Sequence, residues 1–463
     1  MASERTVAPT RLKPDWVVVA LPTVLAFQVF NFKLPFVVVG LMTGYIFLRK
    51  SECKFHLEPG PILFLFASCW IVYSRPESWR KPALLILLMI LVMRLLMTVD
   101  ARRIIASLID GLGLYLVVNV LAHLAGMRAP HLASQRFDRV AEGTGFMRTV
   151  FPMTNSINSP SIIATIYLVS SILVLRYASW TRRGIWFLSA AAAMYAMISA
   201  GSRAALAFTA ILSIGALFFP IFSRWIAQFA SVLAAISALV LPNLIKPIIA
   251  VIAPLVALNS GRDVNESDII SLQGRDQIWN GSIGYWHERI NDFSEILIGF
   301  GSGGQYRSGA SSTYASLVVG LMRNPQQAYV HNSFLQQLFD GGVIGFLLLV
   351  IGVYWASARL ARRRYVWAPW GLSAVFAMTA LLLGNMTEAT MAPGVFQESF
   401  WVLLVLVGVA CQTPADDNGA LRQTCPPEQS QRASRLGATS TKFHELQREP
   451  SGALPTDGWA GRP

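Results

Sequence analysis

Charged residues are scarce in this chain. Asp, Glu, Lys and Arg together make up 14% of its 463 residues, whereas hydrophobic residues make up 54%. A soluble chain of this length carries about a quarter charged residues. The mean hydropathy is correspondingly high, at +0.49. This composition excludes an ordinary soluble globular domain.

Cysteine is also scarce, and the four cysteines (Cys53, Cys69, Cys411 and Cys425) show no CxxC spacing. The spacing therefore indicates neither a zinc site nor a disulfide framework. A glycine-rich phosphate loop between a strand and a helix is missing too, which argues against a nucleotide site. The net charge of +13 is spread over loops and tail. Positive-inside topology and attraction to anionic lipid account for that charge, and we expect no nucleic-acid partner.

The chain has many long apolar runs. Their length is about 17–25 residues, which is the length needed to cross a hydrocarbon core. We count about twelve of them, centred near residues 23, 41, 67, 90, 115, 168, 192, 212, 234, 344, 376 and 403. The predicted fold class is therefore all-α, a polytopic transmembrane helix bundle.

Basic loops indicate the orientation of the spans. With twelve spans and both termini in the cytoplasm, four basic segments fall on the cytoplasmic side: residues 49–54, 100–103, 176–183 and 359–364. The segment SRPESWRK (residues 74–81) disagrees, because it is basic and predicted outside. Residues 241–258 are apolar but broken by three prolines, and we place them at the outer interface or as a re-entrant piece.

This topology divides the chain into four parts. Residues 1–258 form the first part of the bundle, with about nine spans. Residues 259–330 form a large periplasmic loop, called the large loop below. Residues 331–411 hold the C-terminal transmembrane helices. Residues 412–463 are rich in polar residues, Pro and Gly, which predicts a disordered cytoplasmic tail.

Polar residues at the edges of apolar spans are the candidate functional residues, because charges are costly there and usually functional. The first candidate is Arg203, which follows Ser202 in SAGSRAALAF, between two spans. Its planar guanidinium suits phosphate oxygens. The alternative is an arginine that ends a span at the level of the lipid headgroups.

The second candidate lies in the large loop, where Gly-Arg-Asp occurs twice, around Arg262 and around Arg275. Arg275 precedes Ile278 and Trp279, which offer enough apolar surface to anchor a short helix against the membrane. Arg262 has no such anchor. The alternative for both is a solvated loop arginine.

The third candidate is His331, which with Asn332 opens the apolar run YVHNSFLQQLFDGGVIGFLLLV. A neutral imidazole at the water–lipid boundary can accept a proton from an alcohol. Gly341, Gly342 and Gly345 follow, and glycines permit close backbone approach. The alternative is an ordinary interfacial histidine.

The pattern H-N-x9-G-x-x-G, formed by His331, Asn332, Gly342 and Gly345, resembles the signature of the bacterial O-antigen ligase family. That superfamily also holds O-antigen and exopolysaccharide polymerases and protein O-oligosaccharyltransferases. Ser202-Arg203 with its small followers, and GRDQIW at residues 274–279, match two further family features in the same order. Residues 154–166 (TNSINSPSIIATI) resemble the Asn-Pro-Asn segment of the family, but have Asn-Ser-Pro instead. The likeness covers roughly residues 150–350 in detail.

The resemblance implies a GT-C-like fold in the bacterial inner membrane, with the large loop closing over a cavity. The donor would be a glycan linked to undecaprenyl diphosphate. His331 would take the proton of an acceptor hydroxyl or orient the acceptor, and Arg203 and Arg275 would offset the charge on the diphosphate. Ser202, Arg262 and Asn332 would complete the substrate site.

No D-x-D lies on the predicted outer loops, so arginines can replace a divalent metal, and we expect a metal-independent inverting transfer without a cofactor. The acceptor stays open among the lipid A core for a ligase, a growing glycan for a polymerase, and a protein for an oligosaccharyltransferase. A transporter or flippase is the alternative of another class. Transporters place polar groups near mid-membrane and often have two similar halves, whereas this chain shows no repeat and places its polar groups at the outer edge.

Overall fold

The computed structural model describes residues 12–30, 33–49, 56–75, 79–128, 149–154, 156–240, 275–318, 328–364, 368–395 and 397–413. Within these ranges the chain is helical apart from one short antiparallel pairing of β1 (His56–Leu57) with β2 (Gln412–Thr413). The predicted all-α class is therefore confirmed.

The helices fall into three groups along the chain. The first group is α1 (Trp16–Ala26), α2 (Lys33–Leu48), α3 (Gly60–Tyr73), α4 (Arg80–Thr98), α5 (Ala101–Leu124), α7 (Ser159–Val174), α8 (Trp180–Ser199), α9 (Arg203–Phe218) and the helix Ile226–Val240. The second is α12 (Arg275–Arg289), α13 (Phe293–Ile298) and α14 (Gly304–Arg307) in the large loop. The third is α15 (Ser333–Arg363), α16 (Trp370–Gly384) and α17 (Glu398–Cys411). Short 3-10 turns at Phe27–Val29, Leu175–Tyr177, Pro220–Arg224, Ala310–Thr313 and Ala315–Val318 complete the list.

Every predicted span centre falls inside one of these helices. Four of them are long and apolar enough to cross a membrane: α4, α5, α7 with its extension to Tyr177, and α15. Seven further apolar helices in the described ranges are shorter. Large apolar side chains such as Ile211, Phe218 and Phe229 are exposed on the bundle, as a lipid-facing surface requires and as soluble monomers rarely show. The chain is a multi-pass membrane protein, and the number of about twelve spans stays a prediction.

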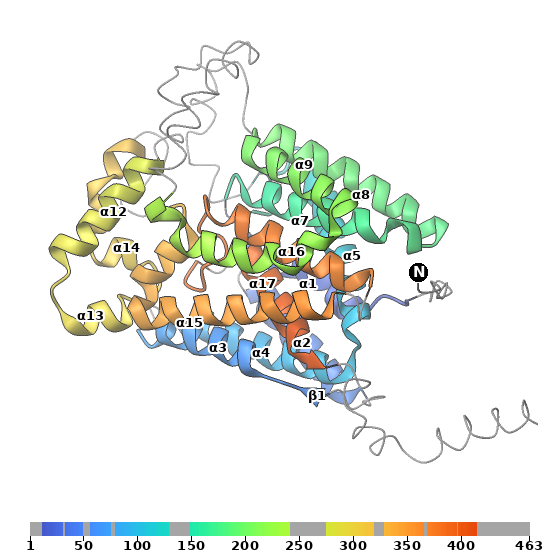
Figure 1. Ribbon diagram of the computed structural model, residues 1–463, viewed down its shortest axis with the longest axis horizontal. Coiled ribbons are helices and arrows are strands. Elements are labelled where there is room, and N and C mark those ends of the chain that lie inside the picture. Colours follow the sequence, from blue (N-terminus) through green and yellow to red (C-terminus); the bar gives the residue numbers. More distant parts are fainter. Residues whose placement is uncertain are drawn as a thin grey trace, which may run out of the picture.

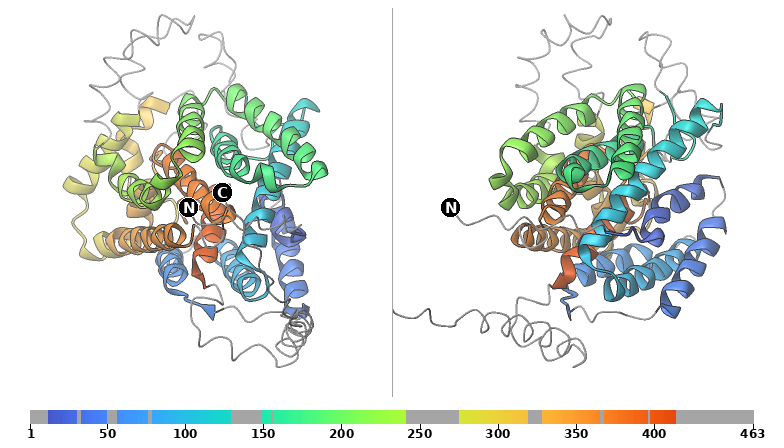
Figure 2. Two further views of the ribbon diagram at one scale, coloured as in Figure 1. Left: turned by 45° about the vertical axis from the view of Figure 1, so that its right-hand side comes forward. Right: turned by 90° about the vertical axis from the view of Figure 1, so that its right-hand side faces the viewer.

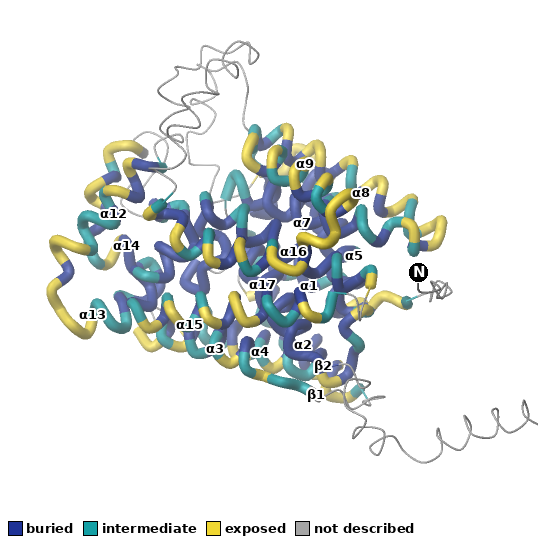
Figure 3. Tube along the Cα trace, in the orientation of Figure 1, coloured by how far each residue is buried: buried dark blue, intermediate teal, exposed yellow. Residues whose placement is uncertain are grey.

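The centre of the bundle is α17, all of whose residues are buried. Figures 1 and 2 show α15 to α17 between α8 and α9 on one side and α2 to α4 on the other. Figure 3 shows the same arrangement as burial, with exposed residues along the outward sides of α8, α9 and α13.

The described part of the large loop gathers at one end of the bundle. Figure 1 shows α12, α13 and α14 at the end where α15 begins, and both α13 and α14 pack against α15. The loop thus covers the start of the helix that follows His331.

Two details differ from the expectations. The apolar run after His331 is not one continuous helix, because Gly342 interrupts α15 with φ 63° and ψ −167°, a conformation open almost only to glycine. Gln412 and Thr413, predicted to begin the tail, are buried, and the Gln412 amide donates to the carbonyls of Leu96 and Val99. The segment 241–258 and the remainder of the predicted tail lie outside the described residues.

A cysteine at Ser312 tests the side on which the large loop lies. Ser312 is exposed, next to α12, and we expect Ser312→Cys in a cysteine-free background to react with an impermeant thiol reagent in intact spheroplasts. Arg362→Cys, at the exposed opposite end of α15, is the matched control and should react only after permeabilisation. The reverse labelling order would put the proposed site on the wrong side of the membrane.

Candidate active site at the start of α15

Asn332 fixes the start of α15. It is the N-cap residue, and its Oδ1 accepts from the backbone N–H groups of Phe334 and Leu335 at 3.0 and 2.9 Å, which satisfies two otherwise unpaired donors. Its Nδ2 donates to Ser237 Oγ at 2.7 Å and to the Met386 carbonyl at 2.9 Å. The side chain is fully buried, so all of its hydrogen-bonding capacity is used inside the protein.

His331 precedes this cap in an unusual backbone conformation. Its φ is +49°, and it is the one non-glycine residue in the described ranges with a positive φ. Such a conformation is strained for a residue with a Cβ, and persists only when its surroundings fix it. The side chain is 34% exposed, so it is held by the protein and still reaches the surface of the site.

Glu388, in the segment between α16 and α17, joins the predicted site residues. Its Oε1 accepts from Arg275 NH2 at 2.5 Å and from Asn158 Nδ2 at 2.7 Å, and its Oε2 lies 3.3 Å from His331 Nδ1. Burial by itself would raise the pKa of this carboxyl, but Arg275 and His331 outweigh it and lower the pKa to about 2. Glu388 is therefore ionised at any working pH.

The charge on Glu388 determines which nitrogen of His331 carries the proton. An ionised carboxylate can only accept hydrogen bonds, so the imidazole must present Nδ1–H to it. In the neutral ring the lone pair is then on Nε2. The geometry thus supplies a proton acceptor whose orientation is set by a carboxylate.

Arg275 is the first residue of α12, and Trp279 follows one turn later. Ile278 and Trp279, which we expected to anchor this helix against the membrane, are instead buried within the protein, where Trp279 Nε1 donates to the Val330 carbonyl at 2.9 Å. One helix therefore reaches Glu388 and the residue before His331. The Arg275 Nε is buried and has no hydrogen-bond partner among the residues that the structure describes.

The structure does not join Arg203 to this group. Arg203 is the exposed first residue of α9, after Gly201 with φ +65°, and forms no hydrogen bond or ion pair with any described residue. Ser202 precedes it without a side-chain cap. Arg262 lies outside the described residues.

The motifs did not identify Glu388 as a site residue. It is 57 positions from His331, in a stretch without helical or strand periodicity. The one feature of the sequence that could have indicated it is its acidic side chain between the last two predicted spans. Asn158 lies in the quoted Asn-Ser-Pro stretch, and its bond to Glu388 shows that this segment belongs to the same group.

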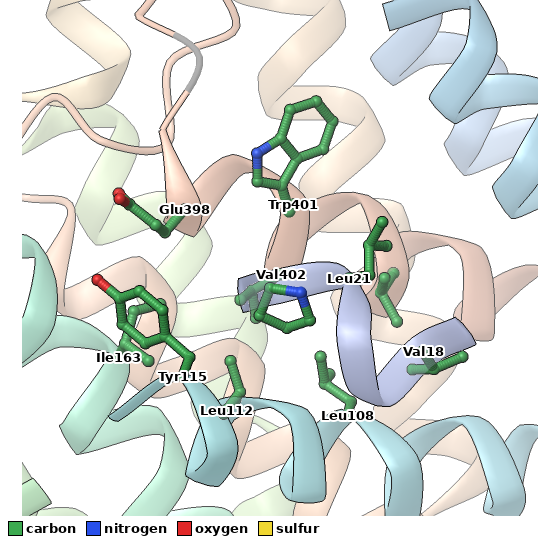
Figure 4. Close-up of a pocket in the computed structure, with 11 residues that line it drawn as sticks. Val18, Leu21, Leu108, Leu112, Tyr115, Ile163, Glu398, Trp401 and Val402 are labelled. Carbon is green, nitrogen blue, oxygen red and sulfur yellow. The ribbon is translucent and has the colours of Figure 1, made fainter. Parts of the chain in front are cut away.

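A small apolar cavity lies elsewhere, between α1, α5, α7 and α17. Figure 4 shows Tyr115 and Glu398 at one side of it and Val18 and Leu21 at the other. Its volume of about 10 Å³ is that of a single water site, so it cannot take a sugar. Among the described residues, no three His, Cys, Asp or Glu side chains form a metal-binding group.

The fold and this group define a multi-pass helical membrane protein with an Arg–Glu–His cluster, formed by Arg275, Glu388 and His331, at one end of the bundle. Residues 187–350 match the model of the family described as O-antigen ligase. The match confirms the resemblance to the O-antigen ligase superfamily, and its range contains Arg203, Arg275 and His331 but not Glu388. No curated protein matches the chain.

Proposed function

We propose that this protein is an inverting glycosyltransferase that moves a glycan from undecaprenyl diphosphate to an acceptor hydroxyl, as an O-antigen ligase does. The observation that carries the proposal is the buried Glu388 carboxylate, which contacts both Arg275 and His331. Glu388 thereby holds a proton acceptor, His331, and a cation, Arg275, in the same site. Glycan transfer from a lipid diphosphate uses the first to take the proton of the acceptor hydroxyl and the second to stabilise the leaving diphosphate.

The step can be written from these residues. The acceptor oxygen attacks the anomeric carbon and forms the new C–O bond, while the bond from that carbon to the diphosphate oxygen breaks. The acceptor proton goes to His331 Nε2, because Nδ1–H faces Glu388. Attack from the face opposite the leaving group inverts the anomeric carbon. Undecaprenyl diphosphate leaves with the electron pair.

The arginines would stabilise the charge that develops on the leaving diphosphate. Glu388 uses one nitrogen of the Arg275 guanidinium, and the Arg275 side chain is 19% exposed, which leaves part of it to face a phosphate oxygen. Arg203 is exposed at the start of α9, where it would meet a lipid-linked substrate.

An O-antigen or exopolysaccharide polymerase, and a protein O-oligosaccharyltransferase, would use the same residues with another acceptor. A polysaccharide transporter or flippase is the remaining candidate. The His331 side chain, the proposed proton acceptor, is 34% exposed at one end of the bundle. A transporter would instead place its polar groups near mid-membrane, so this position favours transfer over transport.

Purified protein in nanodiscs, supplied with an undecaprenyl-diphosphate-linked glycan, tests the proposal. We expect release of undecaprenyl diphosphate only when an acceptor is added, and lipid A core, free glycan and a serine-rich peptide assign the acceptor. EDTA should leave the rate unchanged, because cationic side chains offset the diphosphate charge. Inhibition by EDTA that Mg²⁺ or Mn²⁺ reverses would contradict the metal-independent step. Movement of donor across a vesicle bilayer without any transfer would favour the flippase.

A further inference from the structure

Gln336 makes a set of contacts that the reaction step above does not use. It lies in the first turn of α15 and is fully buried. Its Nε2 donates to Gln305 Oε1 in α14 at 2.6 Å and to Asp340 Oδ1 at 2.9 Å. Its Oε1 accepts from the backbone N–H of Val330 at 3.4 Å. One side chain thus joins the large loop, α15 and the residue before His331.

The loop side of this connection is seated in the break of α15. In an unbroken helix, the carbonyls of Phe339 and Asp340 would accept from residues four positions later. At the break they accept instead from the N–H groups of Phe300 at 2.9 Å and Gly301 at 2.8 Å. The Asp340 carboxylate also accepts from the Gly304 N–H at 2.8 Å.

The close approach predicted for the glycines is confirmed here, with a loop rather than a helix as the partner. A Cβ on Gly342 would lie 2.4 Å from the Leu297 carbonyl, and one on Gly304 would lie 2.3 Å from the Phe339 carbonyl oxygen. A side chain at either position would therefore separate the loop from α15.

The histidine side of the connection is the backbone of Val330. Its carbonyl accepts from Trp279 and its N–H donates to Gln336. Both polar backbone groups next to His331 are therefore held by groups that the large loop supplies or contacts. Removing either hydrogen bond to Val330 should let the backbone of His331 relax, since its φ of +49° is not favourable by itself.

We infer that Gln336 is a positioning residue that makes the orientation of His331 depend on the seating of the large loop. With the loop seated, Gln305 and Asp340 fix the Gln336 amide, and its oxygen holds Val330. The ring of His331 is then directed at Glu388. This inference rests on the role proposed for His331.

Gln337 provides a matched control, because it is adjacent, equally buried and in the same helix, yet its Nε2 donates to Ser68 Oγ of α3 at 2.8 Å. We expect Gln336→Ala to lower kcat by about tenfold to a hundredfold with little change in KM, and Gln337→Ala to leave kcat within about threefold. Hydrogen exchange of the full-length protein in nanodiscs should rise in residues 328–332 for Gln336→Ala only.

If Gln336→Ala fails to accumulate, Gln305→Ala removes the same bridge from the loop side and should give the same loss of kcat. Gln336→Glu should also lose transfer, because its carboxylate would face the oxygens of Asp340 and Gln305 that now accept from the Gln336 amide.

Equal losses of kcat at Gln336 and Gln337, or full transfer by Gln336→Glu, would overturn the inference. Full transfer by His331→Ala would instead overturn the proposed function. The two failures are therefore distinguishable.

Discussion

Replacing His331 by alanine is expected to lower glycan transfer by about 10²–10⁴-fold, the usual contribution of a positioned proton acceptor. Insertion and accumulation should continue, because the N-cap of α15 is Asn332 and its hydrogen bonds do not involve the imidazole. The measurement is single-turnover release of undecaprenyl diphosphate by protein in nanodiscs. A ring that only marks the membrane interface would give no loss.

His287 supplies the control for this substitution. It is exposed in the last turn of α12, in the same loop but outside the Arg–Glu–His cluster. His287→Ala should transfer at the wild-type rate. If the two alanine variants lose the same activity, the effect comes from the loop and not from proton transfer.

The helices could be predicted from sequence because burial in a membrane needs long apolar runs, and such runs are read directly from the chain. The break in α15 could not, since Gly342 lies within a run whose apolar pattern continues on both sides. At the break, the N–H groups of Phe300 and Gly301 donate to the carbonyls of Phe339 and Asp340 in place of N–H groups of α15. A local sequence pattern cannot predict hydrogen bonds to a distant part of the chain.

The site shows the same division. His331 and Arg275 could be found because each is a polar group beside an apolar stretch. Glu388 and Gln336 could not, because their roles come from partners that only the fold brings near: Arg275 is 113 positions from Glu388, and Gln305 is 31 positions from Gln336. Asn332 illustrates the converse, since its motif position suggested substrate contact and its four hydrogen bonds are internal.

The low pKa of Glu388 sets the pH range in which the cluster exists. The folded pKa of about 2 lies below the ordinary value of 4.5, so the stabilisation is complete above about pH 4.5 and is lost as the pH falls toward about 2. A change in transfer rate between about pH 5 and pH 8 must therefore come from another group.

Arg275→Ala is expected to lower transfer by about 10²–10³-fold, the loss typical of removing one electrostatic stabiliser of a developing charge. It should also lower the free energy of unfolding by about 3 kcal/mol, because the buried Glu388 carboxylate loses its cation. Arg275→Lys should rescue transfer only in part, since an ammonium cannot present a planar fork. Arg262→Ala, which shares the Gly-Arg-Asp context without the Ile-Trp anchor, is the comparison and should lose less transfer than Arg275→Ala.

A double-mutant cycle with Glu388→Gln separates the two ways in which Arg275 could act. If Arg275 serves only to neutralise Glu388, its removal should cost nothing further once the carboxylate is gone. If its guanidinium contacts the diphosphate, Arg275→Ala should still cost at least about tenfold in the Glu388→Gln background, while the stability lost in the single variant is regained. We expect the second result, because Glu388 uses only one nitrogen of the Arg275 guanidinium and the Arg275 side chain is 19% exposed. Equal transfer by Glu388→Gln and by the double variant would reduce Arg275 to a structural partner and leave Arg203 as the cation for the leaving group.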